Sequence, residues 1–190
     1  IFKLESATNI IINKNLEIKY KKYWKPDFSE KKLSENQYSE LIKENFNKKI
    51  KQICKSNLKI GLSLSGGIDS NFLLSFFVKN INKNIHTYSI IDEDSRYNEE
   101  ELINYSVKKL KVKNTKIHLS NKNNCFDELK TLIKYHDKPV STINYFLQSY
   151  IYKKMSDDNI NICISGNGAD ELFAGYYHHY VLYYNTLKNK

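Results

Sequence analysis

The sequence has little arginine, few cysteines and no long hydrophobic run. Its net charge of +9 comes from lysines, with Arg96 as the single arginine. Bidentate recognition of bases and phosphates favours arginine. We therefore interpret the lysines as solvated surface and expect no nucleic-acid partner. Cys54, Cys125 and Cys163 form no Cys-x-x-Cys pair, so neither a zinc site nor a disulfide framework is predicted.

No apolar run approaches the roughly 20 residues that span a membrane, and the first residues do not resemble a signal peptide. We therefore expect a cytoplasmic protein without membrane association. The 190 residues are 41% hydrophobic and 27% charged. This composition is typical of a globular protein that can bury a core.

Residues 1–24 predict two β-strands, at 9–12 and 16–20, joined by a turn at residues 13–15. A hairpin by itself is marginally stable in water, and the sequence begins with Ile1 rather than Met. We therefore expect residues 1–24 to be the end of a larger domain. Residues 25–33 contain Pro26 and are expected to form a linker.

Residues 34–190 alternate predicted helices with predicted strands. A Ser34…Gln37 capping box starts a helix that runs to about residue 55. Further helices are expected at 70–78, 98–110, 126–136 and 142–155, and strands at 59–64, 85–91, 114–119 and 160–164. This alternation predicts an α/β fold, a parallel sheet with helices on both faces. The aromatic C-terminal residues are expected to be helical, with their tyrosines in the core or along a substrate wall.

The first candidate site follows the strand at 59–64 and reads Ser65-Gly66-Gly67-Ile68-Asp69-Ser70. Glycines let the backbone turn tightly and approach a ligand closely. The free N–H groups and the dipole of the following helix attract phosphate. The serines add hydroxyl donors, and Asp69 can hold a divalent cation. The spacing matches neither the Walker loop nor the dinucleotide-binding motif.

The second candidate site leaves the strand at 160–164 through Ser165 and Gly166 and carries Asp170 just beyond. Ligands of parallel sheets bind beyond the carboxyl ends of the strands. Both loops are expected there, with Asp69 and Asp170 on one magnesium ion. The alternative is an ordinary helix start, in which Asp170 and Glu171 complement the helix dipole.

The first motif resembles the PP-loop of the ATP pyrophosphatases. Together with Ser165-Gly166-Asn167-Gly168-Ala169-Asp170-Glu171-Leu172-Phe173-Ala174-Gly175-Tyr176, it resembles the synthetase domain of the glutamine-dependent asparagine synthetases. The runs at 2–5 and 23–24 resemble the last strands of that family's glutaminase domain and its exit. The run at 88–90 resembles its strand that contacts adenine, and the run at 97–99 resembles its Asp-Glu element. The resemblance implies a fold like that of the adenine nucleotide alpha hydrolases. The resemblance implies that residues 1–24 are a C-terminal remnant of a glutaminase-type domain and that residues 34–190 are the N-terminal part of the synthetase domain. The sequence would then be a fragment or an abbreviated homologue.

The resemblance also implies an ATP-dependent amide synthesis through an acyl-adenylate. Aspartate, ATP and glutamine or ammonia would give asparagine, AMP and pyrophosphate, with Mg²⁺ as cofactor. Leu64 and Ile90 would border adenine, and Asp69 with Asp170 would hold the metal. The pyrophosphate would be held by Ser65, Gly66, Gly67, Asp69 and Ser70, and the nucleotide would meet Ser165 and Gly166. The expected partners are a small carboxylate, ammonia or glutamine, and a glutaminase domain in cis or in trans; a homodimer is also considered.

Two departures from the family pattern keep alternatives open. Asn167 stands at the family's glutamate, a candidate general base in the amine step, and an amide takes up no proton at neutral pH. Either the base lies elsewhere or the activity is altered. Ala174 stands at a family glycine. The alternatives are an amidotransferase acting on another carboxylate such as a sugar acid, a PP-loop enzyme that modifies tRNA, and a non-catalytic nucleotide-binding remnant.

Overall fold

A computed structural model of the protein describes residues 3–27, 29, 31–55, 57–81, 84–119 and 124–188. The chain forms two compact units, Ile1–Ile42 and Lys43–Lys190. None of the described helices is both long and apolar enough to cross a membrane.

The first unit contains an antiparallel hairpin of β1 (Thr8–Ile12) and β2 (Ile18–Lys22), with Ile12 opposite Ile18. The predicted hairpin is confirmed, but β2 begins two residues later than expected. The reason is the Asn13 side chain, whose Oδ1 accepts the backbone N–H groups of Asn15 at 2.9 Å and Glu17 at 3.0 Å, which lengthens the loop. A strand was also expected at residues 2–5. Phe2 lies outside the described residues, and residues 3–5 do not form a strand.

Helix α1 (Glu35–Ile53) begins at the predicted capping box. The Ser34 backbone N–H donates to Gln37 Oε1 at 2.8 Å, and the Gln37 backbone N–H donates to Ser34 Oγ at 3.4 Å. Two N–H groups at the helix start thus have acceptors, which confirms the expected start.

The second unit is built on a four-stranded sheet in the order β5-β4-β3-β6, with every neighbouring pair parallel. Its strands are β3 (Ile60–Ser63), β4 (His86–Asp92), β5 (Lys113–Leu119) and β6 (Ile162–Ile164). The predicted parallel α/β fold is confirmed, and each strand lies within two residues of its expected position.

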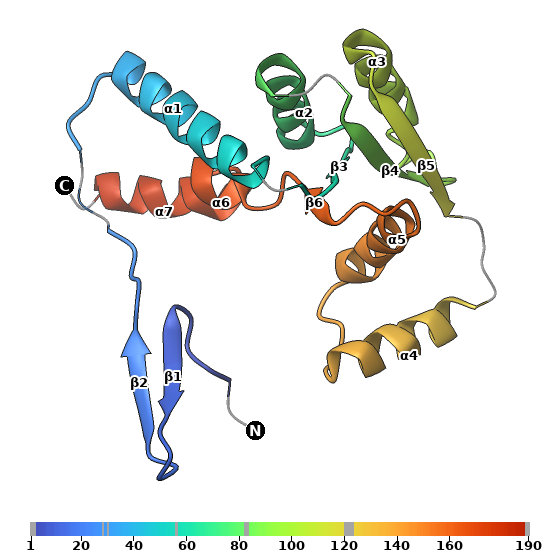
Figure 1. The fold of residues 1–190 in the computed structure, drawn as a ribbon. Coiled ribbons are helices and arrows are strands. Elements are labelled where there is room, and N and C mark those ends of the chain that lie inside the picture. The colour runs from blue at the N-terminus through green and yellow to red at the C-terminus, as the bar shows by residue number, and fades with distance from the viewer. Residues whose placement is uncertain are drawn as a thin grey trace. The chain divides into compact units, whose positions relative to one another are not determined.

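Helices cover both faces of this sheet (Figure 1). On one face α2 (Ile68–Asn80) and α3 (Glu100–Leu110) bury a cluster that includes Leu62, Leu74 and Ile103. On the other face Tyr88 of the sheet packs with Ile151 and Met155. Those two residues belong to α5 (Ile143–Asp157), which follows α4 (Cys125–His136). Burial of apolar side chains on both faces is what stabilises the sheet.

The C-terminal residues form α6 (Ala169–Phe173) and α7 (Tyr177–Lys188), which confirms the predicted helices. The expected packing of their tyrosines in the core is wrong for α7. Tyr177, Tyr180, Tyr183 and Tyr184 are 56–82% exposed, and the helix has no buried residue. An aromatic stripe enters a core only where a neighbouring element covers it, and none of the described elements buries this one.

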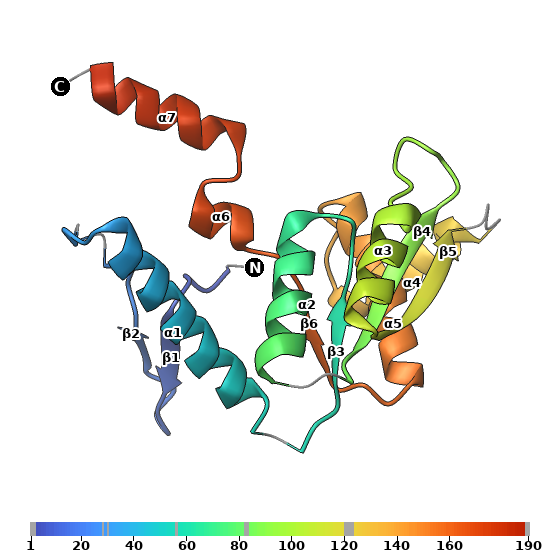
Figure 2. The same cartoon turned by 90° about the horizontal axis from the view of Figure 1, so that it is seen from above.

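The order of strand addition reverses at β3. β4 and β5 are added on one side of β3, whereas the later strand β6 pairs with its other side. In Figure 2 the segment that leaves β3 continues into α2, and the segment that leaves β6 continues into α6. Such a switch point opens a crevice between neighbouring loops, where ligands of parallel sheets bind.

Candidate functional site

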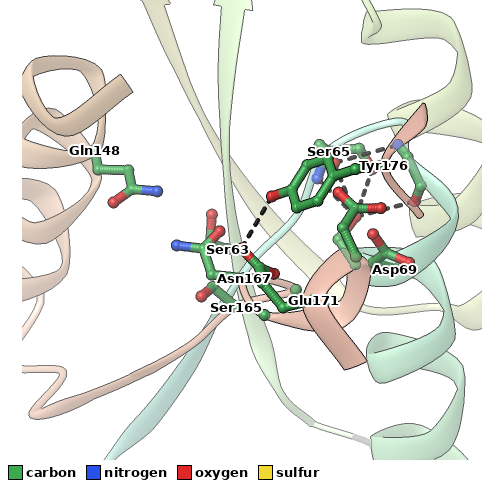
Figure 3. A pocket seen from close by; sticks show the side chains of 13 residues that line it. Ser63, Ser65, Asp69, Gln148, Ser165, Asn167, Glu171 and Tyr176 are labelled. Atoms are coloured by element: carbon green, nitrogen blue, oxygen red, sulfur yellow. Dashed lines mark hydrogen bonds between the residues drawn. The ribbon is translucent and has the colours of Figure 1, made fainter. Parts of the chain in front are cut away.

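A cavity of about 370 Å³ lies where the loops after β3 and β6 meet (Figure 3). We call residues 65–70 the first loop and residues 165–171 the second loop. The cavity is lined by both loops, by the end of β3 and by two residues from elsewhere: Ser63, Ser65, Gly67, Asp69, Ser70, Gln148, Ser165, Gly166, Asn167, Gly168, Asp170, Glu171 and Tyr176. Among the residues that the structure describes, the lining contains hydroxyls, amides and carboxylates but no lysine or arginine.

The two loops are in direct contact at Gly166. A Cβ atom on Gly166 would lie 3.0 Å from Asp69 Cβ and 3.1 Å from the Ser70 backbone nitrogen. Because a Cβ rarely comes so close to backbone atoms, only glycine allows this approach without a shift of one loop. The close contact holds Asp69 next to the second loop.

Hydrogen bonds inside the first loop fix its shape. The buried Ser70 hydroxyl accepts the Ser65 backbone N–H at 3.1 Å and lies 3.0 Å from Ser65 Oγ. The Asn71 side-chain amide donates to the Ser65 and Gly67 carbonyls at 3.0 and 2.8 Å. At the start of α2, the N-cap residue Gly67 has no capping side chain. The first N–H groups of this helix therefore lack a side-chain acceptor and can meet an anion.

The second loop turns into α6 through Gly168, whose φ of +94° favours glycine. Past α6, the Gly175 backbone N–H donates to the Asp170 carbonyl at 2.9 Å. A Cβ on Gly175 would lie only 1.8 Å from Asp170 Oδ1. The absence of a side chain at Gly175 thus leaves the space that the Asp170 carboxylate occupies.

The cavity offers few ligands for a metal ion. The described residues contain no group of three or more His, Cys, Asp or Glu side chains that could hold one. Asp69 and Asp170 both line the cavity. Mg²⁺ is commonly bound by one or two carboxylates together with substrate phosphates and water. The donor set therefore fits a magnesium ion that arrives with a nucleotide, rather than a metal held by the protein alone.

Tyr176 and Glu171 form a pair at the cavity (Figure 3). The Tyr176 hydroxyl donates to Glu171 Oε1 at 2.9 Å. This hydrogen bond raises the pKa of Tyr176, because it favours the protonated phenol beside a carboxylate. Gln148, from α5, lies across the cavity from Asp69 (Figure 3).

The structure brings together most of the residues expected at the site. Ser65, Gly67, Asp69, Ser70, Ser165, Gly166, Asn167 and Asp170 all line the cavity. Leu64, Gly66 and Ile90 do not: Leu64 is 2% exposed in the core, and Ile90 packs against the cluster around Tyr88. Leu64 thus faces the core and Ile90 is half-buried against it. The roles of Leu64, Gly66 and Ile90 at the nucleotide stay predictions.

Three residues of the site were not predicted from the sequence: Ser63 and Gln148, which line the cavity, and Asn71, which donates to the first loop. Asn71 directly follows the first motif, and an amide in the first turn of a helix was a usable signal. Gln148 lies in the middle of α5, more than 70 residues after the first loop, and no motif surrounds it. Only the packing of α5 on the sheet brings it to the cavity.

The chain matches the asparagine synthase family model over residues 41–189. It is similar to asparagine synthetase [glutamine-hydrolyzing] 1 of Bacillus subtilis, with 25% identity over 92% of this chain. It is also similar to the putative asparagine synthetase [glutamine-hydrolyzing] 2 of Methanocaldococcus jannaschii, with 31% identity over 94% of this chain. The chain spans 27% and 34% of the lengths of these two curated relatives.

Among solved structures, the NH3-dependent NAD synthetase of Campylobacter jejuni aligns with a TM-score of 0.47 and 19% identity, over 76% of this chain and 61% of that one. The NMN synthetase of Francisella tularensis aligns with a TM-score of 0.43 and 19% identity, over 76% and 59%. The family model covers most of the chain, including both loops and all four strands of the parallel sheet. The chain therefore belongs to the asparagine synthase family.

Proposed function

We propose that the cavity binds ATP with Mg²⁺ and that the protein forms an amide through an acyl-adenylate, with aspartate as the acid. In the first step a carboxylate oxygen of the acid attacks the α-phosphorus of ATP. The bond from that phosphorus to the bridging oxygen breaks, and pyrophosphate leaves. In the second step ammonia, free or released from glutamine, attacks the acyl carbon and loses a proton, and AMP leaves with the bonding electrons.

The residues of the first loop would hold the pyrophosphate. Ser65 and Ser70 carry hydroxyls, and the start of α2 presents N–H groups without a capping side chain. Donors fixed where negative charge develops lower the barrier, because they need no reorganisation during the reaction. A Mg²⁺ ion held by Asp69 and Asp170 would neutralise charge on the phosphates. Ser165 and Gly166 would contact the nucleotide from the second loop.

The observation that carries the proposal is the contact of Gly166 with Asp69 and Ser70. This contact brings the ends of β3 and β6, about 100 residues apart in sequence, to one cavity. Each loop contributes a carboxylate to the lining of that cavity. An ordinary helix start, in which Asp170 only complements a dipole, would not require such a contact.

The direct test is exchange of labelled pyrophosphate into ATP by the protein expressed from its complete reading frame. Exchange that depends on aspartate and Mg²⁺ is the expected result. A panel containing aspartate and a sugar acid identifies the acid, and a comparison of glutamine with ammonia identifies the nitrogen donor. The Asp157→Asn variant, an exposed change at the end of α5 outside the cavity, serves as control. Absence of exchange with every acid would contradict the proposal.

Asn167 favours a second candidate, a nucleotide-binding protein without turnover. Its side chain lines the cavity at the position where the family has glutamate, and an amide cannot accept the proton that the attacking amine loses. Calorimetric titration with ATP and Mg²⁺ separates the two candidates. Binding without exchange or amide formation would support the second, and binding with exchange would support the first.

A further inference from the structure

We propose that Glu99 is a positioning residue, which fixes the first loop from outside the cavity. The inference rests on the proposed function of that loop. The Gly66 backbone N–H donates to Glu99 Oε2 at 2.9 Å, across 33 residues of sequence. Neither Gly66 nor Glu99 lines the cavity, so the carboxylate anchors the loop without occupying the space offered to the ligand.

Packing supports the same contact. A Cβ on Gly66 would lie 3.0 Å from Glu99 Cβ and 3.1 Å from Leu102 Cδ1. The loop therefore rests directly on the start of α3, with no room for a side chain between them. Close packing and a hydrogen bond thus act on the loop at the same residue.

The other N–H groups of this part of the loop have acceptors inside the motif. The Ser65 N–H donates to Ser70 Oγ at 3.1 Å, and the Gly67 N–H donates to Ser65 Oγ at 3.2 Å. The Gly66 N–H is the one of the three that reaches another element. Its bond to Glu99 ties the position of the whole loop to α3.

The segment that carries Glu99 is itself held in place. Asn98 Nδ2 donates to the Asp92 carbonyl at 2.8 Å, and Asn98 Oδ1 accepts the Glu100 backbone N–H at 2.8 Å. Glu100 forms a 2.7 Å ion pair with Lys116 of β5. Because its neighbours are fixed, Glu99 can hold the first loop in a fixed position. A binding site requires its groups to be placed within a fraction of an ångström.

This role depends on an acceptor atom rather than on charge. The Glu99→Gln variant keeps an oxygen that accepts the Gly66 N–H but carries no negative charge. Glu99→Ala removes the acceptor. Glu101→Ala, at an exposed position of the first turn of α3, is the matched control.

The test measures the Kd for ATP with Mg²⁺ by calorimetry, and KM and kcat in pyrophosphate exchange, on the protein from its complete reading frame. Glu99→Ala is expected to raise Kd and KM for ATP about tenfold, because the Gly66 N–H loses its acceptor and the loop loses its fixed position. Glu99→Gln is expected to stay within about threefold of the unmodified protein. Glu101→Ala should have the same Kd and KM for ATP as the unmodified protein. Unchanged ATP binding in Glu99→Ala, or an equal loss in Glu99→Gln, would overturn the proposal.

Hydrogen exchange of the Gly66 amide gives a readout that needs no nucleotide. Glu99→Ala should accelerate this exchange, while Glu99→Gln and Glu101→Ala should leave it slow. Equal exchange in all variants would overturn the anchor. If the unmodified protein neither binds ATP nor exchanges pyrophosphate, the proposed function fails, and the Gly66 amide still decides whether Glu99 positions the loop.

Discussion

Gly166 stands against Asp69 so closely that a Cβ on the glycine would lie 3.0 Å from the Cβ of the aspartate. The two residues belong to loops that leave neighbouring parallel strands, β6 and β3. The sheet brings the loops near each other, and the missing side chain lets them touch. The proposed nucleotide site depends on this contact.

Adding a side chain at Gly166 is expected to weaken binding of ATP with Mg²⁺. Gly166→Ala must push the second loop away from Asp69 and Ser70 by a few tenths of an ångström, and Gly166→Val must push it further. Misplacement on this scale costs about tenfold for alanine and more for valine. Calorimetry measures both, with Ser156→Ala on the exposed end of α5 as control. A valine variant that binds ATP normally would show that the contact does not matter.

Asp69→Asn and Asp170→Asn are expected to raise the Mg²⁺ concentration needed for half-maximal ATP binding by about tenfold or more, because a neutral amide is a weaker ligand for this cation. Asp157→Asn changes the net charge equally and lies outside the cavity, so it should leave the Mg²⁺ dependence unchanged. A titration of Mg²⁺ at fixed ATP measures all three. The metal assignment would be refuted by equal Mg²⁺ dependence in the two cavity variants and the control.

Gly175→Ala should reproduce the effect of Asp170→Asn while keeping every carboxylate. The new Cβ would lie 1.8 Å from Asp170 Oδ1, so the carboxylate must leave its present position. The Mg²⁺ titration measures the change. Combining Gly175→Ala with Asp170→Asn should add little, since both act on the same ligand. Additive losses would instead indicate that Gly175 acts elsewhere.

Ala174→Gly is expected to stabilise the protein by about 1 kcal/mol, since alanine is strained in the left-handed region. Ala174 ends α6 with φ 57° and ψ 42°. Chemical denaturation gives the free energy of unfolding. Asn159→Gly is the matched control: Asn159 has a φ of 58°, but asparagine tolerates this region, so its replacement should gain less. Destabilisation by Ala174→Gly would contradict the prediction.

His86 should make the fold weaker in mild acid. Burial, with a smaller contribution from Lys113, lowers the pKa of His86 from its ordinary value of 6.5. The unfolded chain therefore binds this proton at a higher pH than the folded chain does. Stability is fully present above about pH 6.5 and falls as the pH drops from there toward the lowered pKa. The neutral ring lies 2.8 Å from Thr115 Oγ1 and 3.1 Å from the Tyr88 hydroxyl.

Thermal unfolding between pH 8 and 5 measures this effect. His86→Gln should flatten the profile below pH 6.5, whereas His118→Gln, at an exposed position of β5, should leave it steep. When the pH series is extended below 3.8, the ordinary pKa of an aspartate, a second loss is expected, because hydrogen bonds from Lys154 and Tyr88 lower the pKa of Asp158. Protonation of Asp158 as the pH falls through that lowered pKa removes the stabilisation. A profile that does not change in His86→Gln would refute the assignment to this histidine.

Several elements could be predicted from neighbouring residues alone. The Ser34–Gln37 capping box, the hairpin and the alternation of strands with helices all depend on contacts within a few residues, which a local pattern records. The same limit explains the error in α7. Its tyrosines form a stripe suited to a core, but burial depends on which element lies opposite, and helical periodicity does not carry that information.

The sequence by itself determined the two loop motifs, the order of the elements and the family, because these follow from residue types at short spacings. Tertiary structure alone decided that β6 pairs with β3, that Gly166 meets Asp69, that Gln148 reaches the cavity and that Glu99 holds Gly66. Each of these contacts joins segments separated by at least 33 residues. They form only when apolar burial on both faces of the sheet fixes the strands side by side.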